Sequence, residues 1–225
     1  MPGLFVTFEG GEGSGKTTQL KTLLAHLRAT GRDTVETRDP GGTPIGKQIR
    51  ELLLDRENTR MAAIAELLLY EASRAQLVDE VIRPVLREGR IVLCDRFTDS
   101  TLAYQGHGRR LDRDLILRLN DLATGGMRPN LTLLLDLPPE VGLTRAQERL
   151  AHPRTRRDRI EEEVLSFHQR VREGYLAIAA AEPGRVVVLD ASHGILAIEA
   201  QIRQRVEALL EPSALPSDSG ARAAG

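Results

Sequence analysis

The stretch with the clearest chemical content lies near the N-terminus and reads GGEGSGKT from Gly10 to Thr17. Its spacing is G-x-x-x-x-G-K-[ST], in which a glycine-rich turn lets successive backbone N–H groups face a phosphate chain. Glycine permits this close approach because it has no Cβ. The Lys16 ammonium can reach the β- and γ-phosphates of a nucleotide, and the Thr17 hydroxyl can hold Mg2+. The predicted ATP-binding residues of this stretch are Gly10, Gly11, Glu12, Gly13, Ser14, Gly15, Lys16, Thr17 and Thr18.

The flanking segments support this interpretation. Residues 3–9 have the pattern of a buried strand, and residues 15–30 carry apolar side chains at helical spacing up to Gly31. A helix that begins directly after the loop adds partial positive charge for a phosphate. A flexible glycine-rich turn is the alternative, and motif and context together favour the phosphate site. Kinases, ATPases and nucleotide switches share the motif, so it does not choose among reactions.

Asp95, Asp136 and Asp190 each stand at the end of a predicted strand. Each could supply the carboxylate that supports Mg2+ at the carboxyl ends of parallel strands, although aspartate is also common there without such a role. Asp95 differs because Arg96 follows it directly, so that a carboxylate and a guanidinium could serve metal and phosphate together. We predict Thr17 and Asp95 as metal ligands and Lys16 and Arg96 as catalytic residues.

Other side chains could hold an acceptor molecule. Arg38 leaves a predicted strand just before a Pro-Gly-Gly turn, where it could clamp a phosphate. Tyr70 and Arg74 are four residues apart and share a helix face, which offers a ring to stack on a flat base and a donor for its carbonyl. An amphipathic helix with an exposed arginine is the alternative for this pair. Tyr104 and Gln105 could line the same pocket.

An arginine-rich segment spans residues 145–163. Its six arginines are Arg145, Arg149, Arg154, Arg156, Arg157 and Arg159. A solvated charged helix is the usual alternative for such a run. Its place between two long predicted helices, in a chain predicted to bind polyphosphate, favours a mobile lid that closes over the phosphates and excludes water.

These residues need a scaffold, and the pattern of the chain predicts one. Apolar strands are expected at 3–9, 33–39, 90–95, 130–136 and 185–190, and helices at 15–30, 44–55, 61–87, 99–105, 112–124, from Pro138 onward, 159–181 and 194–210. Strands that are apolar on both faces and alternate with helices indicate a parallel sheet covered on both sides. We therefore predict a three-layer α/β fold in one domain over residues 1–210, with a lid at about 146–158 and a disordered tail at 211–225.

Composition narrows the partners. The chain has 225 residues, 41% of them hydrophobic, and a formal net charge of -1. This charge argues against a nucleic-acid polymer or an anionic membrane as a partner, and no apolar run approaches the roughly 20 residues of a membrane span. The single cysteine, Cys94, is expected to be a core residue of a cytoplasmic protein, and no secretory signal is seen at the N-terminus. The five histidines are expected to be surface or packing residues.

Six motifs occur in order between residue 4 and about residue 163: FEGGEGSGKTTQ, RDPGGT, LLLYEASRAQLV, DRFTDSTLAYQG, RPNLTLLLDLPPEVGL and DRIEEE. With them the chain closely resembles the bacterial thymidylate kinases, which are P-loop nucleoside monophosphate kinases. The combination of RDPGGT with DRF…ST.AYQG is specific to that family. The resemblance implies a five-stranded P-loop NTPase fold and transfer of a phosphoryl group from ATP to dTMP with Mg2+.

The resemblance also implies how the acceptor is held. Arg38 and Arg96 match arginines that grip the dTMP phosphate, and Glu12 matches an acidic residue near the 3′-hydroxyl. Tyr70 matches the aromatic residue that stacks on thymine, and Arg74 matches the donor to the thymine 4-oxygen.

Further positions follow from the same resemblance. Thr101 and Gln105 fall where polar groups read the base edge, and Tyr104 matches an aromatic residue under the sugar, where a ribose 2′-hydroxyl would clash. Arg145 lies where an arginine packs on adenine. Because Gly13 occupies the loop position that carries the catalytic arginine in one branch of the family, the resemblance places that arginine in the lid. The candidates are Arg149, Arg154, Arg156 and Arg157.

Two alternatives stay open at the level of the sequence. One is a related kinase with another nucleoside monophosphate as acceptor. The other is a nucleotide switch or partition ATPase, which would have no use for RDPGGT, the Tyr70 and Arg74 pair or the arginine-rich segment. The resemblance further implies a homodimer that packs through the long helices preceding Asp95.

Overall fold

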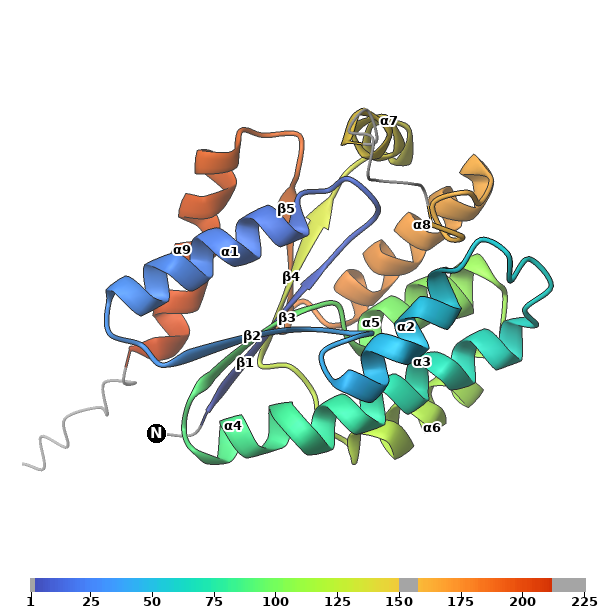
Figure 1. Ribbon diagram of the computed structural model, residues 1–225. Coiled ribbons are helices and arrows are strands. Elements are labelled where there is room, and N and C mark those ends of the chain that lie inside the picture. Colours follow the sequence, from blue (N-terminus) through green and yellow to red (C-terminus); the bar gives the residue numbers. More distant parts are fainter. Residues whose placement is uncertain (1–2, 150–157, 212–225) are drawn as a thin grey trace, which may run out of the picture.

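The structure is a computed structural model that describes residues 3–149, without the side chain of Arg149, and residues 158–211. Five parallel strands form one sheet in the order β2-β3-β1-β4-β5 (Figure 1). The strands are β1 Leu4–Glu9, β2 Thr34–Arg38, β3 Ile91–Asp95, β4 Leu131–Asp136 and β5 Val186–Asp190. The helices are α1 Lys16–Ala29, α2 Pro44–Leu54, α3 Ala63–Leu77, α4 Arg83–Arg87, α5 Thr98–Thr101, α6 Arg113–Thr124, α7 Pro139–Arg149, α8 Leu165–Ala181 and α9 Ile195–Leu210, with π-helical segments η1 Val78–Ile82 and η2 Leu102–Gly108.

Helices cover both faces of the sheet, and successive side chains of its central strands point to opposite faces, so the side chains on both sides are buried. On β1, Leu4, Val6 and Phe8 pack with the apolar faces of α1 and α9. Phe5 points the other way and packs with α3, η1 and α4. Each large apolar side chain buried in this way contributes roughly 1.5–3 kcal/mol, which explains why these strands are apolar throughout rather than alternating. The predicted three-layer α/β architecture is confirmed.

The strand order brings the candidate residues to one edge of the sheet. β1 lies between β3 and β4, so the loop that follows it opens at the point where chain connections diverge to the two sides, which is where parallel sheets bind ligands. The register pairs Phe8 with Asp95 and Arg38 with Asp95 across neighbouring strands. The ends of β1, β2 and β3 therefore present the glycine-rich loop, Arg38 and Asp95 side by side.

One predicted element begins later than expected. The helix predicted at 159–181 starts at Leu165, because the turn that follows Asp158 ends at Val164, whose ψ of 151° is extended. The Asp158 Oδ1 atom accepts hydrogen bonds from the backbone N–H of Ile160 and Glu161, both at 2.9 Å. These bonds cap a single turn, in which the backbone N–H of Glu162 also donates to the Asp158 carbonyl oxygen at 3.2 Å. The helix predicted at 61–87 is confirmed as a continuous run of α3, η1 and α4.

The predicted lid and tail fall largely outside the described residues. Residues 146–149 belong to α7 and Asp158 to the turn before α8, whereas 150–157 and 212–225 lie outside the description. Among the helices that the structure describes, none has the length and apolar character needed to cross a membrane.

Candidate active site

The glycine-rich loop is shaped by close backbone contacts. Gly10, Gly13 and Gly15 have φ angles of 137°, 67° and 90°, which side-chain-bearing residues rarely adopt. A Cβ atom on Gly13 would lie 2.1 Å from the carbonyl oxygen of Gly142, and one on Gly10 would lie 2.4 Å from that of Leu135. Glycine is therefore required at these two positions, and the loop is held against β4 and α7. We call residues 10–17 the phosphate loop.

The Lys16 ammonium lies inside this loop. Its Nζ atom donates to the carbonyl oxygens of Gly10 at 3.0 Å and Gly11 at 2.7 Å, and to Ser14 Oγ at 3.3 Å. Burial, together with the charge of Arg96, lowers the pKa of Lys16 to about 8. This ammonium is already poorly solvated, and its hydrogen-bond partners carry no negative charge. Binding a phosphate therefore adds a favourable charge interaction at a small further cost in solvation, so the position suits polyphosphate binding.

Of the three strand-end aspartates, Asp95 is the one that reaches the loop. Thr17 Oγ1, at the start of α1, donates to Asp95 Oδ2 at 3.0 Å. By contrast, Asp136 accepts from Arg172 Nε at 2.7 Å, and Asp190 accepts from the backbone N–H of Ser192. The structure thus brings together the two residues predicted as metal ligands.

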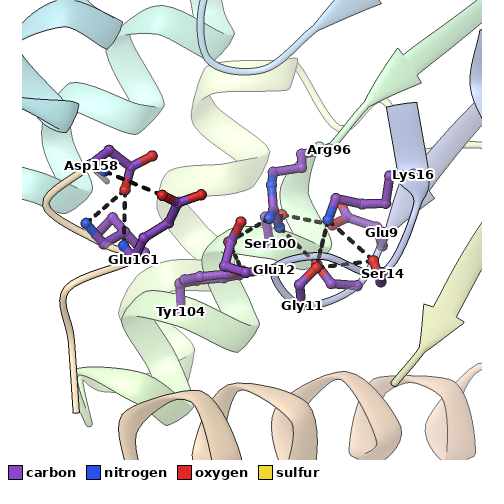
Figure 2. A network of polar contacts seen from close by, with 12 residues as sticks. Glu9, Gly11, Glu12, Ser14, Lys16, Arg96, Ser100, Tyr104, Asp158 and Glu161 are labelled. Carbon is purple, nitrogen blue, oxygen red and sulfur yellow. Dashed lines mark hydrogen bonds and ion pairs between the residues drawn. The ribbon is translucent and has the colours of Figure 1, made fainter. Parts of the chain in front are cut away.

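Arg96 combines a strained backbone with a side chain held by several contacts. Its φ of 71° is a left-handed conformation that costs a residue other than glycine about 1–3 kcal/mol. The guanidinium donates to Glu12 Oε1 at 2.9 Å (Figure 2). It also donates to Gly10 O and to Tyr175 OH, both at 3.1 Å, and it lies over the Tyr104 ring. The strain and the contacts together fix a positive charge beside the phosphate loop.

Glu12 lies between Arg96 and Tyr104, whose hydroxyl donates to Glu12 Oε1 at 2.8 Å (Figure 2). Burial opposes its ionisation, but Arg96, Lys16 and the Tyr104 hydroxyl outweigh burial and lower the pKa of Glu12 to about 2. The carboxylate is therefore ionised at neutral pH. It is placed to accept a hydrogen bond from a ligand hydroxyl.

Two adjoining hollows open around these residues. A cleft of about 710 Å3 is lined by the loop residues from Glu12 to Thr18 and by Arg38, Asp95, Arg96 and Arg145. A smaller cavity of about 80 Å3 is lined by Tyr70, Arg74, Arg96, Thr101, Tyr104 and Gln105. All the described residues predicted for ATP or acceptor binding therefore lie in or beside one of the two hollows, except that Gly10 and Gly11 form the loop wall behind Lys16. We name these hollows the nucleotide cleft and the acceptor cavity.

The acceptor cavity is closed at one end by Arg74, which is 1% exposed. Its Nε donates to Asp39 Oδ2 at 2.6 Å, Nη1 to Glu71 Oε1 at 2.8 Å and to Asn120 Oδ1 at 2.7 Å, and Nη2 to the Phe97 carbonyl at 3.3 Å. A guanidinium has five N–H bonds, and these contacts with described residues use four. One Nη2 hydrogen is left for a ligand acceptor such as a carbonyl oxygen.

The remaining walls of the acceptor cavity fit a flat base. Tyr70 lies one helical turn before Arg74 on α3, as predicted. Thr101 is 1% exposed and places its hydroxyl-bearing side chain in the cavity wall. Tyr104 and Gln105 come from η2, a π-helical segment of the kind often found at functional sites.

Two predicted arginines lie at the rim of the nucleotide cleft, and others fall outside the description. Arg38 is exposed at the end of β2. Arg145, on α7, donates from Nη1 to the carbonyl oxygen of Ala191 at 3.1 Å. The side chain of Arg149 and all of Arg154, Arg156 and Arg157 lie outside the described part of the chain.

The sequence interpretation missed several residues of the site. Arg50 lines both hollows and donates to the Pro40 carbonyl at 3.2 Å, and burial and the nearby Arg38 lower the pKa of its guanidinium. Asp158 also lines both hollows. An arginine on an amphipathic helix and an aspartate in a charged run carry no local signal, so only the fold reveals them.

A buried carboxylate behind Arg96 was also missed. Glu9, at the end of β1, accepts from the backbone N–H of Phe97 at 2.7 Å, from Ser100 Oγ at 2.6 Å and from Tyr175 OH at 2.8 Å. Burial and the charge of Asp99 raise the pKa of Glu9 to about 7. This network anchors the backbone directly after Arg96. Cys94, beside it, is fully buried in the core, as predicted.

Comparison with known proteins agrees with this geometry. A family model described as thymidylate kinase matches residues 8–202, which is most of the chain. The chain belongs to the thymidylate kinase family. The resemblance seen in the motifs is confirmed. The match to the family model includes the phosphate loop, the acceptor cavity and the strands from the end of β1 to β5.

Individual relatives support the family over nearly their full length. The chain is similar to a thymidylate kinase of Geobacter sulfurreducens, with 58% identity over 194 residues that cover 86% of this chain and 91% of the relative. A thymidylate kinase of Synechococcus sp. is 52% identical over 209 residues, which cover 93% and 95%. The crystal structure of thymidylate kinase from Ehrlichia chaffeensis matches with a TM-score of 0.73 at 32% identity and covers 92% of this chain and 99% of that one.

Proposed function

We propose that the protein transfers the γ-phosphoryl group of ATP to dTMP, giving ADP and dTDP. One observation carries the proposal beyond the family: the nucleotide cleft and the acceptor cavity share lining residues. The shared residues are Glu12, Asp39, Arg50, Arg96 and Asp158. Two anionic esters bound in these hollows would meet at a boundary that carries two guanidinium groups.

Transfer requires little covalent work from the protein. A phosphate oxygen of dTMP attacks the γ-phosphorus of ATP, and the bond from that phosphorus to the bridging oxygen breaks as ADP leaves. No general base is needed, because a phosphate monoester with a second pKa near 6 is already a dianion at about pH 7. The protein must align the two phosphates and neutralise charge, and Lys16 and Arg96 are placed to do so.

We further propose that Thr17 and Asp95 hold Mg2+. Their oxygen atoms lie 3.0 Å apart at the mouth of the phosphate loop, and hard oxygen donors suit this ion. Among the described residues, no group of three or more His, Cys, Asp or Glu side chains could hold a metal by itself. This fits an ion that is bound through one carboxylate and substrate phosphates. When bound, Mg2+ would offset the negative charge of the triphosphate.

For the acceptor, we propose contacts from the acceptor cavity and from Arg38 in the adjoining nucleotide cleft. Arg38 and Arg96 bind the dTMP phosphate, Glu12 accepts from the 3′-hydroxyl, and Tyr70 stacks on the thymine ring. Arg74 donates its remaining N–H to the 4-oxygen, and Thr101 and Gln105 meet the base edge. Tyr104 is held against the sugar position by its bond to Glu12 and by Phe167, whose ring centroid is 6.2 Å away.

On the nucleotide side, Arg145 packs on adenine, and a lid arginine neutralises the transferred group. The candidates for that arginine are Arg149, Arg154, Arg156 and Arg157, in a lid at about 146–158. The lid belongs to one catalytic domain over residues 1–210, with a tail at 211–225. A cytoplasmic location is proposed because the chain has a single, buried cysteine.

A homodimer is proposed from an exposed apolar surface on α2 and α3. Ile45 and Leu52 on α2 are 51% and 53% exposed, and Ile64 and Leu68 on α3 are 44% and 50% exposed. Large apolar side chains gathered on neighbouring helices are typical of an interface between subunits. Light scattering after gel filtration should give twice the monomer mass, and a monomer at micromolar concentration would contradict this proposal.

An acceptor screen tests the proposed reaction. Purified protein is incubated with ATP, Mg2+ and one of dTMP, dUMP, dCMP or dGMP, and both ADP and the nucleoside diphosphate are quantified. We expect dTDP formation with the highest kcat/KM for dTMP. ATP hydrolysis without phosphoryl transfer would support a nucleotide switch instead, and preference for another monophosphate would identify a related kinase.

A further inference from the structure

Glu66 is a buried carboxylate to which the proposed reaction gives no role. It is 1% exposed and lies on α3, one turn before Tyr70 and two turns before Arg74, on the face that these residues turn toward the acceptor cavity. It does not line either hollow itself. Its contacts connect it to a residue that does.

Four donors saturate this carboxylate. Gln105 Nε2 donates to Oε1 at 2.8 Å, and Arg109 donates from Nε to Oε1 at 3.1 Å and from Nη2 to Oε2 at 3.0 Å. Arg159 Nη2 donates to Oε2 at 2.6 Å. Burial disfavours the charge of Glu66, but the bonds from Arg109, Gln105 and Arg159 outweigh it and lower the pKa of the carboxyl group.

The charge state of Glu66 decides the orientation of Gln105. An ionised carboxylate only accepts hydrogen bonds, so the Gln105 amide must turn its NH2 group to Glu66. Gln105 is 1% exposed and lines the acceptor cavity. With its nitrogen engaged by Glu66, the amide oxygen is the end left for a ligand.

We propose that Glu66 is a positioning residue for base selection: by holding the Gln105 nitrogen, it presents the Gln105 oxygen to the N3–H of thymine. The inference rests on the proposed dTMP kinase function and extends it. Arg74 presents a remaining N–H for the 4-oxygen. An acceptor beside a donor matches the N3–H and C4=O edge of thymine and opposes cytosine, which has a bare N3 and a 4-amino group.

A specific physical consequence separates this role from simple core stability. In Glu66→Gln the new amide can donate as well as accept, so Gln105 is free to turn and offer its NH2 group to the cavity. Such a turn suits cytosine and opposes thymine. A residue that only stabilised the fold would change the use of both acceptors equally.

The experiment measures kcat and KM for dTMP and dCMP at saturating ATP and Mg2+. For Glu66→Gln we expect the ratio of kcat/KM for dTMP to that for dCMP to fall about tenfold, mainly through KM, because one neutral hydrogen bond is lost and one mismatch is removed. The matched control is Glu163→Gln, which also removes a carboxylate partner of Arg109 but does not touch Gln105. Its ratio should stay within about twofold of the original protein.

Glu66→Gln leaves Arg109 and Arg159 facing a neutral group, which could prevent folding. A second pair of variants therefore tests the same role without this charge imbalance. The double variant Glu66→Gln with Arg159→Gln keeps the net charge and is compared with Arg159→Gln alone. The ratio between acceptors cancels any loss of the Arg159 contact with the Leu53 carbonyl, which affects both acceptors alike. The ratio should again be lower when Glu66 is replaced.

The outcomes separate the two proposals. If the unmodified protein forms no dTDP, the proposed function fails. If it forms dTDP but folded Glu66→Gln, or the double variant against its control, retains the original ratio, only the positioning role of Glu66 is overturned. An equal fall in kcat/KM for both acceptors would also overturn it.

Discussion

The phosphate loop and the acceptor cavity lie side by side but are built in opposite ways. In the loop, Lys16 donates hydrogen bonds to residues two to six positions away, and two of its three acceptors are backbone carbonyls. In the cavity, Arg74 binds Asp39, Asn120 and Phe97, which are 35, 46 and 23 positions away. A phosphate can be bound by local backbone geometry, whereas a base is recognised by side chains that the fold must collect.

The pKa shifts of the two cationic side chains, Lys16 in the loop and Arg74 in the cavity, also have opposite directions. Burial lowers the pKa of Lys16 to about 8, so the loop holds a charge that gains from a ligand. Burial also disfavours the charge of Arg74, but Asp39 and Glu71 overcome it and raise its pKa above the usual value. Within the part of the chain that the structure describes, the Lys16 charge has no ion-pair partner at hydrogen-bond distance and is available to a substrate phosphate. The Arg74 charge is already paired with Asp39 and Glu71 and also stabilises the fold.

Replacing Lys16 should therefore remove activity without unfolding the protein. For Lys16→Ala we expect turnover to fall by at least about 100-fold, because one charge-stabilising donor in an active site is worth 10² to 10³ in rate. A coupled ADP assay measures the loss, and thermal melting should show a nearly unchanged Tm. Lys21→Ala, an exposed lysine on the same helix, is the control and should retain full activity. Near-normal turnover of Lys16→Ala would show that Lys16 does not stabilise charge during phosphoryl transfer.

Replacing Arg74 should have the opposite signature. Arg74→Ala leaves Asp39 and Glu71 buried without their cation, which costs about 3–5 kcal/mol of unfolding free energy. Urea denaturation measures this loss, and in the folded fraction selectivity for dTMP should suffer more than use of ATP. Arg128→Ala breaks a solvent-exposed pair with Asp121 and should cost at most about 1 kcal/mol. Equal stability of the two variants would contradict the contrast between loop and cavity.

The pH dependence of ATP use sharpens the contrast. A lysine whose pKa is lowered is charged below that pKa and neutral above it, so kcat/KM for ATP should decline above about pH 8, by about tenfold per pH unit, as Lys16 of the free enzyme loses its proton. At saturating ATP the bound polyphosphate favours the ammonium, and the decline in kcat should move to higher pH. Arg74 contributes nothing in this range. A profile of kcat/KM that stays flat across pH 8 would show that Lys16 remains charged.

The smallest effect is expected at the rim of the nucleotide cleft. Arg145→Ala should raise KM for ATP about threefold to tenfold through loss of a cation–π contact with adenine, with kcat little changed. Initial-rate measurements at saturating dTMP test this. Arg203→Ala, in an i, i+4 ion pair with Glu199 on α9, is the control and should leave KM unchanged. A large fall in kcat for Arg145→Ala would mean that this arginine acts on the transferring phosphoryl group.

The elements of the fold were predictable because each is encoded in a short window. The strands at β1, β3 and β4 are apolar on both faces, and α1 and α9 carry helical periodicity, so their existence and parallel arrangement followed from pattern. The start of α8 was predicted six residues early, at 159 instead of Leu165, because Asp158 caps a separate turn and the extended backbone of Val164 ends that turn before the helix begins.

The residues of the candidate site also fall into those that a short stretch of sequence predicts and those that only the fold brings together. The sequence by itself determined the phosphate loop, because glycines, a lysine and a threonine at fixed spacing dictate the local backbone path and the groups on it. Only the tertiary structure placed Arg50 and Asp158 between the two hollows and linked Glu66 to Gln105, which is 39 positions away. Hydrogen bonds and ion pairs act over a few ångströms of space whatever the separation along the chain, so residues without a local pattern gain their roles only when the sheet and its helices bring them into contact.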